Sequence, residues 1–203
     1  MYSDIVIPDK NEEELVDMAL KLGYSKLYLL YEFQEGESFR SKIQKLKDFS
    51  SEKIRIEPII LASKNKIEKA RQFGKVIVKA DSDNRFFFEK KKLMIFNLES
   101  SKIEDFIFYR NSGMDQILCK LANKNSNTIC FSFNNLLNTD KYERTKIFGR
   151  IMQNIRLCRK YKVKTLIASF ATKPFEIRAS HDLASLFQIL GMHPSETQNA
   201  LDY

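Results

Sequence analysis

Side chains that commonly ligate metals or act in catalysis are few in this chain and lie far apart. Its two histidines, His181 and His193, have no neighbouring ligands, and no cysteine and histidine residues show zinc-site spacing. Asp81 and Asp83 could bind a hard cation, although an Asp-Ser-Asp-Asn run more commonly caps the helix that follows it. No glycine-rich phosphate loop of the Rossmann or Walker type is present. We therefore predict no catalytic residue and no metal site.

Positive charge is concentrated in the second half of the chain. The formal net charge is +8, and residues 141–178 hold 11 basic and 2 acidic residues. Within a helix expected over 141–161, Lys146, Arg150, Arg156 and Lys160 fall off the apolar stripe and should face solvent. Such a face could follow the phosphates of a nucleic acid, or it could simply keep the helix soluble. Acidic partners four residues away are almost absent, which favours binding of a polyanion.

Two loops add basic residues to this set. Arg110 lies just before Asn111 and Ser112, either of which could cap a helix, so its guanidinium and the first N–H groups of that helix would cradle an anion. The expected apolar stripe of this helix consists of Met114, Ile117, Leu118 and Leu121.

The second basic loop follows a strand near residue 170. It carries Lys173, Arg178 and, between them, Phe175. Phe175, Phe108 and Tyr109 could stack on bases, although an aromatic ring beside a helix more often belongs to the core. The cations of both loops are candidates for contact with phosphate groups.

The elements that must position these groups alternate regularly along the chain. Most of the expected strands are continuous apolar runs, which is typical of parallel strands covered by helices. The strands are expected at residues 3–7, 26–31, 54–61, 75–79, 93–97, 128–133 and 165–170. Helices are expected after Asn11, which with Glu14 resembles a capping box, around residues 43–49, 67–73 and 141–161, and after Ser180.

Seven strand–helix alternations indicate an α/β protein with a mostly parallel sheet. We predict a distorted TIM-type barrel of about seven parallel strands within a single domain over residues 1–192, and an open doubly wound sheet is the alternative. Residues 193–203 are expected to form a loose C-terminal tail. Cys119, Cys130 and Cys158 read as buried thiols in a reducing cytoplasm, and we expect no signal peptide and no membrane span.

Four segments in order carry a resemblance to a known family. They are "RNSGMDQILCKLA" (110–122), "ICFSFNNLL" (129–137), "RIMQNIRLCRKYKV" (150–163) and "IASFATKPFEIRASHDLASLFQILGM" (167–192). Together they resemble protein component 3 of archaeal ribonuclease P, the counterpart of a subunit of eukaryotic ribonuclease P/MRP. The first hundred residues match mainly in the rhythm of strands and helices.

The resemblance implies a fold and a function. The fold would be a distorted barrel related to the polymerase-and-histidinol-phosphatase phosphoesterases. The chain would be a non-catalytic subunit of ribonuclease P, the endonuclease that removes the 5′ leader from precursor tRNA. The chemistry would belong to the catalytic RNA with Mg²⁺, with no cofactor in the protein. Its partners would be ribonuclease P RNA, precursor tRNA in the holoenzyme and another small protein subunit.

The RNA-binding candidates combine this resemblance with the basic loops. Arg110, Lys120, Arg156 and Arg178 stand at basic positions of the family, and Lys160 and Lys173 extend the same charge. Ser112, Asp115 and Ser180 are possible supporting residues. The segment 99–109 departs from the family by being longer and more apolar, and we expect it to form a short extra helix or strand covering the barrel.

A stand-alone, metal-dependent phosphoesterase is the alternative function. Phosphoesterases of the related superfamily carry a metal-binding His-x-His at the end of their first strand. Here that strand reads Ser3-Asp4-Ile5-Val6-Ile7-Pro8, without histidine. The isolated chain is therefore uncertain as an enzyme.

Overall fold

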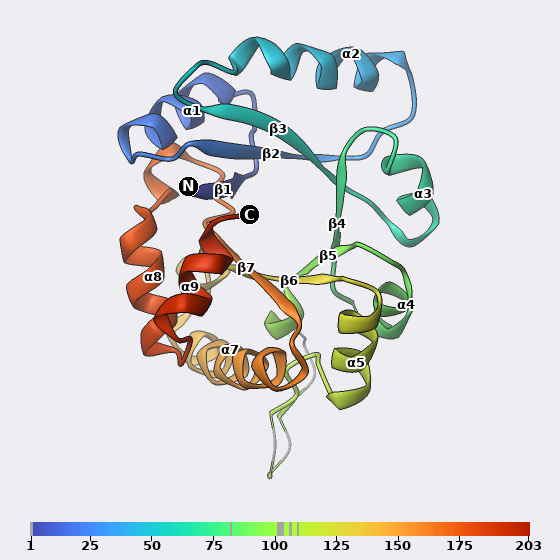
Figure 1. The fold of residues 1–203 in the computed structure, drawn as a ribbon, viewed down its shortest axis with the longest axis vertical. Helices are drawn as coiled ribbons and strands as arrows, with labels where there is room; N and C mark the ends of the chain where they lie inside the picture. The colour runs from blue at the N-terminus through green and yellow to red at the C-terminus, as the bar shows by residue number, and fades with distance from the viewer. Residues whose placement is uncertain (1, 82, 101–103, 106, 109) are drawn as a thin grey trace.

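Seven parallel strands form the centre of the molecule (Figure 1). The structure, a computed structural model, describes residues 2–81, 83–100, 104–105, 107–108 and 110–203. Each strand pairs with its neighbours in chain order, so the sheet runs from β1 to β7 without a crossover. The strands are β1 Ser3–Val6, β2 Lys26–Glu32, β3 Arg55–Leu61, β4 Lys75–Lys79, β5 Met94–Phe96, β6 Thr128–Ser132 and β7 Lys164–Ala168. All seven predicted strands are confirmed, with ends that differ by at most two residues.

The sheet curls until its first strand meets the segment that follows its last strand. The Phe170 N–H donates to Ile5 O at 2.8 Å, and the Ile7 N–H donates to Ala171 O at 2.8 Å. Between them, Val6 forms a parallel bridge with Ala171. The result is a nearly closed barrel of the TIM type, as predicted, and the open doubly wound sheet is excluded.

Apolar side chains fill both sides of this barrel, which explains the continuous apolar strands of the sequence. Alternate strand residues point into the barrel and form one cluster, which includes Ile5, Tyr28, Ile59, Ile77 and Leu166. At the end where the strands finish, the rings of Phe96 and Phe170 stack with their centroids 5.2 Å apart. The remaining strand residues pack beneath the helices in a larger outer cluster.

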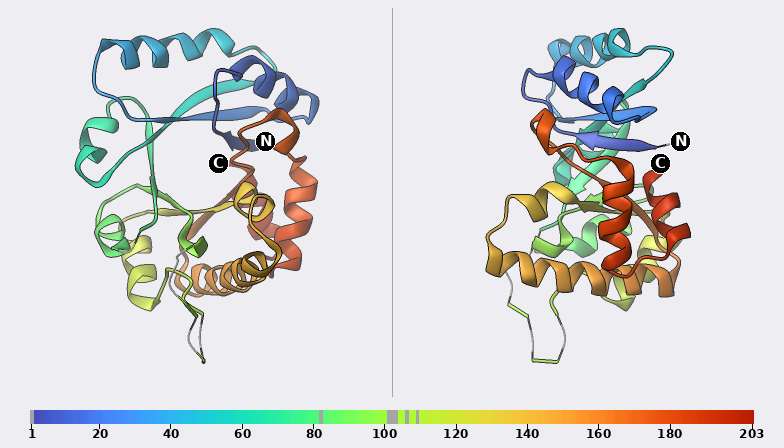
Figure 2. Two further views of the ribbon diagram at one scale, coloured as in Figure 1. Left: turned by 180° about the vertical axis from the view of Figure 1, so that it is seen from behind. Right: turned by 90° about the vertical axis from the view of Figure 1, so that its left-hand side faces the viewer.

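Helices surround the ring of strands on its outer side (Figure 2). The α-helices are α1 Glu12–Lys21, α2 Glu37–Lys45, α3 Ile67–Ala70, α4 Asn84–Glu89, α5 Gln116–Lys124, α6 Phe133–Leu137, α7 Lys141–Tyr161, α8 Ser180–Ile189 and α9 Pro194–Leu201. Short 3₁₀ turns are η1 Leu46–Phe49, η2 Lys64–Lys66, η3 Leu98–Ser100 and η4 Pro174–Glu176. No helix in the described part of the chain combines the length and the apolar character needed to cross a bilayer. The three cysteines are free and buried, as predicted.

Several predicted helix caps are wrong. The side chain of Asn11 makes no capping hydrogen bond to α1, and Ser180 is the first residue of α8 rather than its cap. Helix α5 begins at Gln116 and is capped by Asp115, whose Oδ1 accepts from the Leu118 N–H at 2.8 Å. Arg110 therefore lies six residues before α5, and the anion cradle expected from the N-terminus of that helix does not form.

Residues 193–203, expected to be a loose tail, instead contain helix α9, which packs on the outside of the barrel against β7 and α8. Ala200 and Leu201 are buried, and the Ser3 hydroxyl donates to Leu201 O at 3.1 Å. Arg159 of α7 binds both carboxylate oxygens of Glu196 at 2.6 Å. The prediction failed because the apolar residues of this segment are few and their burial depends on packing against α8 and β7, which a local pattern does not show.

Candidate nucleic-acid interface

Four predicted cations share one surface over α5 and α7, which we call the α5–α7 face: Arg110, Lys120, Arg156 and Lys160. Helix periodicity places Gly149, Gln153, Arg156 and Lys160 on one stripe of α7. The Asn123 amide of α5 donates to Tyr161 O at 2.9 Å, which holds the two helices side by side. Lys120, Arg156 and Lys160 are exposed. Among the described residues, none of the four cations forms an ion pair with a carboxylate.

Gly149 allows Arg110 to join this face. The Arg110 side chain lies directly on the backbone of α7, so a Cβ at position 149 would overlap its guanidinium group. The Gln153 amide donates to Arg110 O and to the Ser112 hydroxyl, both at 2.9 Å. Arg110 is therefore aligned with the cations of α7 by contacts that its distance in sequence does not reveal.

Arg150 does not face solvent as predicted, but lies in the interior with only 2% of its surface exposed. Its Nε donates to Asp105 Oδ1 at 2.9 Å and its Nη1 donates to Glu99 O at 2.9 Å. A buried guanidinium needs a paired charge and acceptors for its N–H groups, and the segment before Arg110 supplies both. Arg150 is thus an anchor for that segment rather than a phosphate ligand.

The neighbouring Asn154 and Glu99 complete this buried polar cluster. The Asn154 amide donates to Glu99 Oε1 at 2.8 Å and to Ser112 O at 2.9 Å. Burial raises the pKa of Glu99 to about 7, although the hydrogen bond from Asn154 and the charge of Arg150 oppose the rise. With Glu99 protonated, Arg150 and Asp105 neutralise each other, so the cluster as a whole carries no net charge.

The segment 99–109 does not cover the barrel in its described part. Ile107 and Phe108 are 94% and 95% exposed, while Glu99 and Asp105 anchor the segment near its start. Residues 101–103, 106 and 109 lie outside the described residues, and so the expected role of Tyr109 in stacking falls outside them too. The described residues 104, 105, 107 and 108 show neither helix nor strand.

Lys173 and Arg178 lie apart from the α5–α7 face, on the connection between β7 and α8. The Arg178 guanidinium lies over the Phe133 ring of α6, 5.3 Å from its centroid, and its Nη1 donates to Phe175 O and Ile177 O. Lys173 is exposed. The six predicted RNA-binding residues thus fall into two groups, one of four and one of two.

The predicted supporting residues have structural partners. Ser112 is buried against Gln153, Asp115 caps α5, and Ser180 starts α8. Reasoning from the sequence missed Gly149, Gln153 and the anchoring role of Arg150. A glycine inside an otherwise strong helix pattern was the one available signal, because such a position often marks a close approach by another group.

Barrel enzymes place their catalytic and metal-binding groups at the end of the barrel where the strands finish. Lys64 Nζ lies 3.3 Å from both Asp81 Oδ2 and Asp83 Oδ2, so a lysine occupies the position that a cation would take. The described residues contain no group of three or more histidine, cysteine or acidic side chains able to hold a metal ion.

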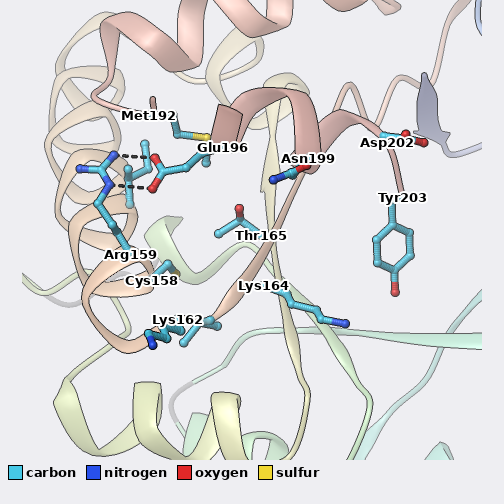
Figure 3. A pocket seen from close by; sticks show the side chains of 12 residues that line it. Cys158, Arg159, Lys162, Lys164, Thr165, Met192, Glu196, Asn199, Asp202 and Tyr203 are labelled. Atoms are coloured by element: carbon cyan, nitrogen blue, oxygen red, sulfur yellow. Dashed lines mark hydrogen bonds and ion pairs between the residues drawn. The ribbon is translucent and has the colours of Figure 1, made fainter. Parts of the chain in front are cut away.

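A cavity of about 560 Å³ lies between the end of α7, the start of β7 and α9 (Figure 3). Its most prominent polar contact, between Arg159 and Glu196, joins the two helices and leaves neither charge free. Cys158 also lines it, but burial raises the pKa of this thiol well above its usual value, which disfavours the nucleophilic thiolate. We therefore interpret the cavity as a structural junction between α7, β7 and α9.

Comparisons with known proteins agree with this picture. The family model described as RNase P subunit p30 matches residues 105–203. "Ribonuclease P protein component 3" of Methanosarcina acetivorans is 26% identical over 122 residues, covering 60% of this chain and 48% of the relative. The protein of the same name from Methanococcus vannielii is 24% identical over 178 residues, covering 88% of this chain and 68% of the relative.

The archaeal relatives and a solved structure extend the match. "Ribonuclease P protein component 3" of Methanocaldococcus jannaschii is 31% identical over 81 residues, or 40% of this chain and 35% of the relative. The chain spans about half, or less, of the length of the curated relatives that it matches first. A chain in a structure described as "cryo-EM structure of archaeal Ribonuclease P with mature tRNA" superposes with a TM-score of 0.77 at 19% identity, covering 98% of this chain and 87% of that one.

The fold and the site define a TIM-type α/β barrel that bears a basic surface and, in its described part, no metal-ligand cluster. Within that class, the chain is similar to RNase P subunit p30, whose family model matches residues 105–203, and to archaeal proteins named "Ribonuclease P protein component 3".

Proposed function

We propose that the chain is a non-catalytic protein subunit of ribonuclease P, the RNA-based endonuclease that removes the 5′ leader from precursor tRNA. One observation carries the proposal: Arg110, Lys120, Arg156 and Lys160 are gathered on one face without neutralising carboxylates among the described residues. Unpaired cations on a rigid surface bind phosphates regardless of sequence and gain affinity by releasing counterions. The family match and the archaeal relatives support ribonuclease P RNA as the source of those phosphates.

Lys173 and Arg178 belong to the same proposal as a second contact with RNA. The holoenzyme would also contain precursor tRNA and another small protein subunit, in the cytoplasm of an archaeal cell. The cleavage would be carried out by the RNA with Mg²⁺, with no cofactor bound to the protein. The domain proposed for this role is the barrel over residues 1–192, to which α9 is joined.

Reconstitution of the holoenzyme tests the proposal. Arg156→Gln and Lys160→Gln should each weaken binding to ribonuclease P RNA and reduce the salt slope of log K by about 1, because each removes one phosphate contact. Cleavage of precursor tRNA at low Mg²⁺ should fall with them. Lys53→Gln, which removes an exposed lysine at the turn before β3, is the matched control and should change neither quantity. Unchanged RNA affinity in the α7 variants would disprove the proposed site.

The alternative, a stand-alone metal-dependent phosphoesterase, has less support. Strand β1 lacks histidine, and Lys64 takes the place of a cation between Asp81 and Asp83. Hydrolysis of a phosphate ester by the purified chain, without RNA and dependent on added metal, would overturn our assignment.

A further inference from the structure

The connections after β6 and β7 present two aromatic rings to solvent. Phe175 in η4 is 82% exposed, and Tyr142 in the first turn of α7 is 71% exposed. Helix α6 links them: Arg178 lies over Phe133 at its start, and Arg144 donates to Leu137 O at its end. We call this surface the β6–β7 rim and define it by Tyr142, Phe175 and the cations Lys141, Arg144, Lys173 and Arg178. In the right-hand view of Figure 2, η4 and the turn between α6 and α7 project on the same side of the molecule.

The loop that carries Phe175 is held rigidly by its own hydrogen bonds. Glu176 Oε2 accepts from the Thr172 N–H at 2.8 Å, from the Thr172 hydroxyl at 2.9 Å and from the Lys173 N–H at 3.2 Å. On the barrel side, the Asn11 amide donates to Thr172 O at 2.9 Å and the Tyr24 hydroxyl donates to Arg178 O at 2.7 Å. These bonds hold the Phe175 ring toward solvent in the free protein. A partner can therefore bind the ring without the entropic cost of ordering the loop.

The charges of the rim are unbalanced in favour of cations. Glu143 pairs with Lys146 at 2.8 Å, whereas Asp140 and Glu176 accept hydrogen bonds from neutral donors, which do not cancel their charge. The four cations of the rim therefore outnumber its two carboxylates that have no ion pair among the described residues. Among the described residues, Arg144 and Arg178 donate only to carbonyl oxygens, which leaves their positive charge in place. Within the described chain, no carboxylate forms an ion pair with Lys141 or Lys173.

Outward rings among unneutralised cations match the chemistry of unpaired nucleotides. Bases stack on aromatic faces only when they are free of a duplex, while the neighbouring phosphates pair with lysine and arginine. A protein partner would bury the rings but would have to bring its own carboxylates to four cations. We propose that the β6–β7 rim binds a single-stranded segment of RNA, with bases stacked on Phe175 and Tyr142. This inference rests on the proposed function and extends it by a second contact of a different kind from the phosphate-tracking α5–α7 face.

The test compares two RNA probes on the 203-residue chain: an unstructured oligouridine and an RNA duplex of the same total charge. Phe175→Leu and Tyr142→Leu keep an apolar side chain but remove the ring. Each should weaken binding of oligouridine about tenfold, equivalent to about 1.4 kcal/mol. Binding of the duplex should stay within about twofold, because its bases are not available for stacking. Ile189→Ala, which alters another exposed apolar side chain on α8, should change neither affinity.

The outcomes separate this inference from the proposed function. If the two leucine variants bind oligouridine as the unaltered protein does, the stacking surface is disproved, and a docking role for the rings on a protein subunit becomes the better explanation. Equal losses for both probes would also disprove it, since stacking cannot act on a duplex. A third outcome is that Arg156→Gln and Lys160→Gln leave both affinities unchanged while the leucine variants weaken binding of oligouridine. That result would support the β6–β7 rim and disprove RNA binding by the α5–α7 face. An unaltered protein that binds neither probe would overturn both proposals.

Discussion

The carboxyl group of Glu99 ties the stability of the barrel to pH. Burial raises its pKa to about 7 from an ordinary value of 4.5, so folding favours its protonated form. The resulting stabilisation is complete below about pH 4.5 and is lost as the pH rises through about 7. Glu99→Gln should remove this loss, of roughly 1–3 kcal/mol, and make the protein more stable than the unaltered chain at pH 8. Urea unfolding at pH 5 and pH 8, followed by circular dichroism, measures the difference.

The neighbouring Asn154 gives a structural reason to expect a gain. Its Oδ1 is buried without a hydrogen-bond partner, while its amide group donates to Glu99 Oε1. A glutamine at position 99 keeps an acceptor for the Asn154 amide and adds an N–H donor to this cluster, as the protonated acid adds an O–H donor. Glu104→Gln, an exposed carboxyl of the same segment, is the control and should leave the pH dependence as it is. A Glu99→Gln protein that loses stability between pH 5 and pH 8 as steeply as the original would contradict the assignment.

Substitution of Gly149 in α7 should lower RNA affinity without lowering the stability of the fold. Alanine is a better helix former than glycine by about 1 kcal/mol, so Gly149→Ala should leave the free energy of unfolding unchanged or raise it. Its Cβ would nevertheless displace the Arg110 side chain, which is flexible enough to move away. We expect affinity for ribonuclease P RNA to fall to the value of Arg110→Gln.

A double-mutant cycle checks that the effect runs through Arg110. Combining Gly149→Ala with Arg110→Gln should cost no more affinity than either change alone, because both remove the same contact. Thr145→Ala, at an exposed position of α7, should retain full affinity. Additive losses would show that Gly149 contributes to RNA binding in some other way.

The regular elements were predictable from the chain, whereas the loops that bear the site were not. The seven strands and α7 follow from local apolar patterns, and α7 was predicted with its observed bounds. Helices α6 and α9 were missed because they are short and their few apolar residues form no clear stripe without the elements that cover them. Arg150 was assigned to solvent because helix periodicity cannot show that Asp105 and Glu99 O meet it in the interior. For the same reason, the grouping of Arg110 with Arg156 and Lys160 required the structure.

The barrel as a whole depends on one seam, where β1 meets the segment after β7. Elsewhere the strands pair in continuous registers, but this seam has a single bridge and two backbone hydrogen bonds. Asp4 reinforces it: Oδ1 accepts from the Ser169 N–H and Oδ2 from the Ser169 hydroxyl, both at 2.6 Å. The Asp4 side chain thus provides hydrogen bonds at a seam where backbone hydrogen bonds are few. We therefore expect the barrel to open first at this seam.

Asp4→Ala tests this order of opening. The change leaves buried donors of Ser169 and Ile5 without their acceptor and should cost roughly 2–4 kcal/mol of unfolding free energy. Hydrogen exchange should quicken selectively at the amides of Ile7 and Phe170, which bridge the seam, and less at Ala62 and Ala80, which bond across β3–β4 and β4–β5. Ser50→Ala removes the acceptor of the Ile56 N–H at 3.0 Å and is the matched control, because it should affect the start of β3 and leave exchange at the seam unchanged. Uniformly faster exchange in the Asp4 variant would mean that the barrel unfolds as one unit and that the seam is no weaker than the other strand pairs.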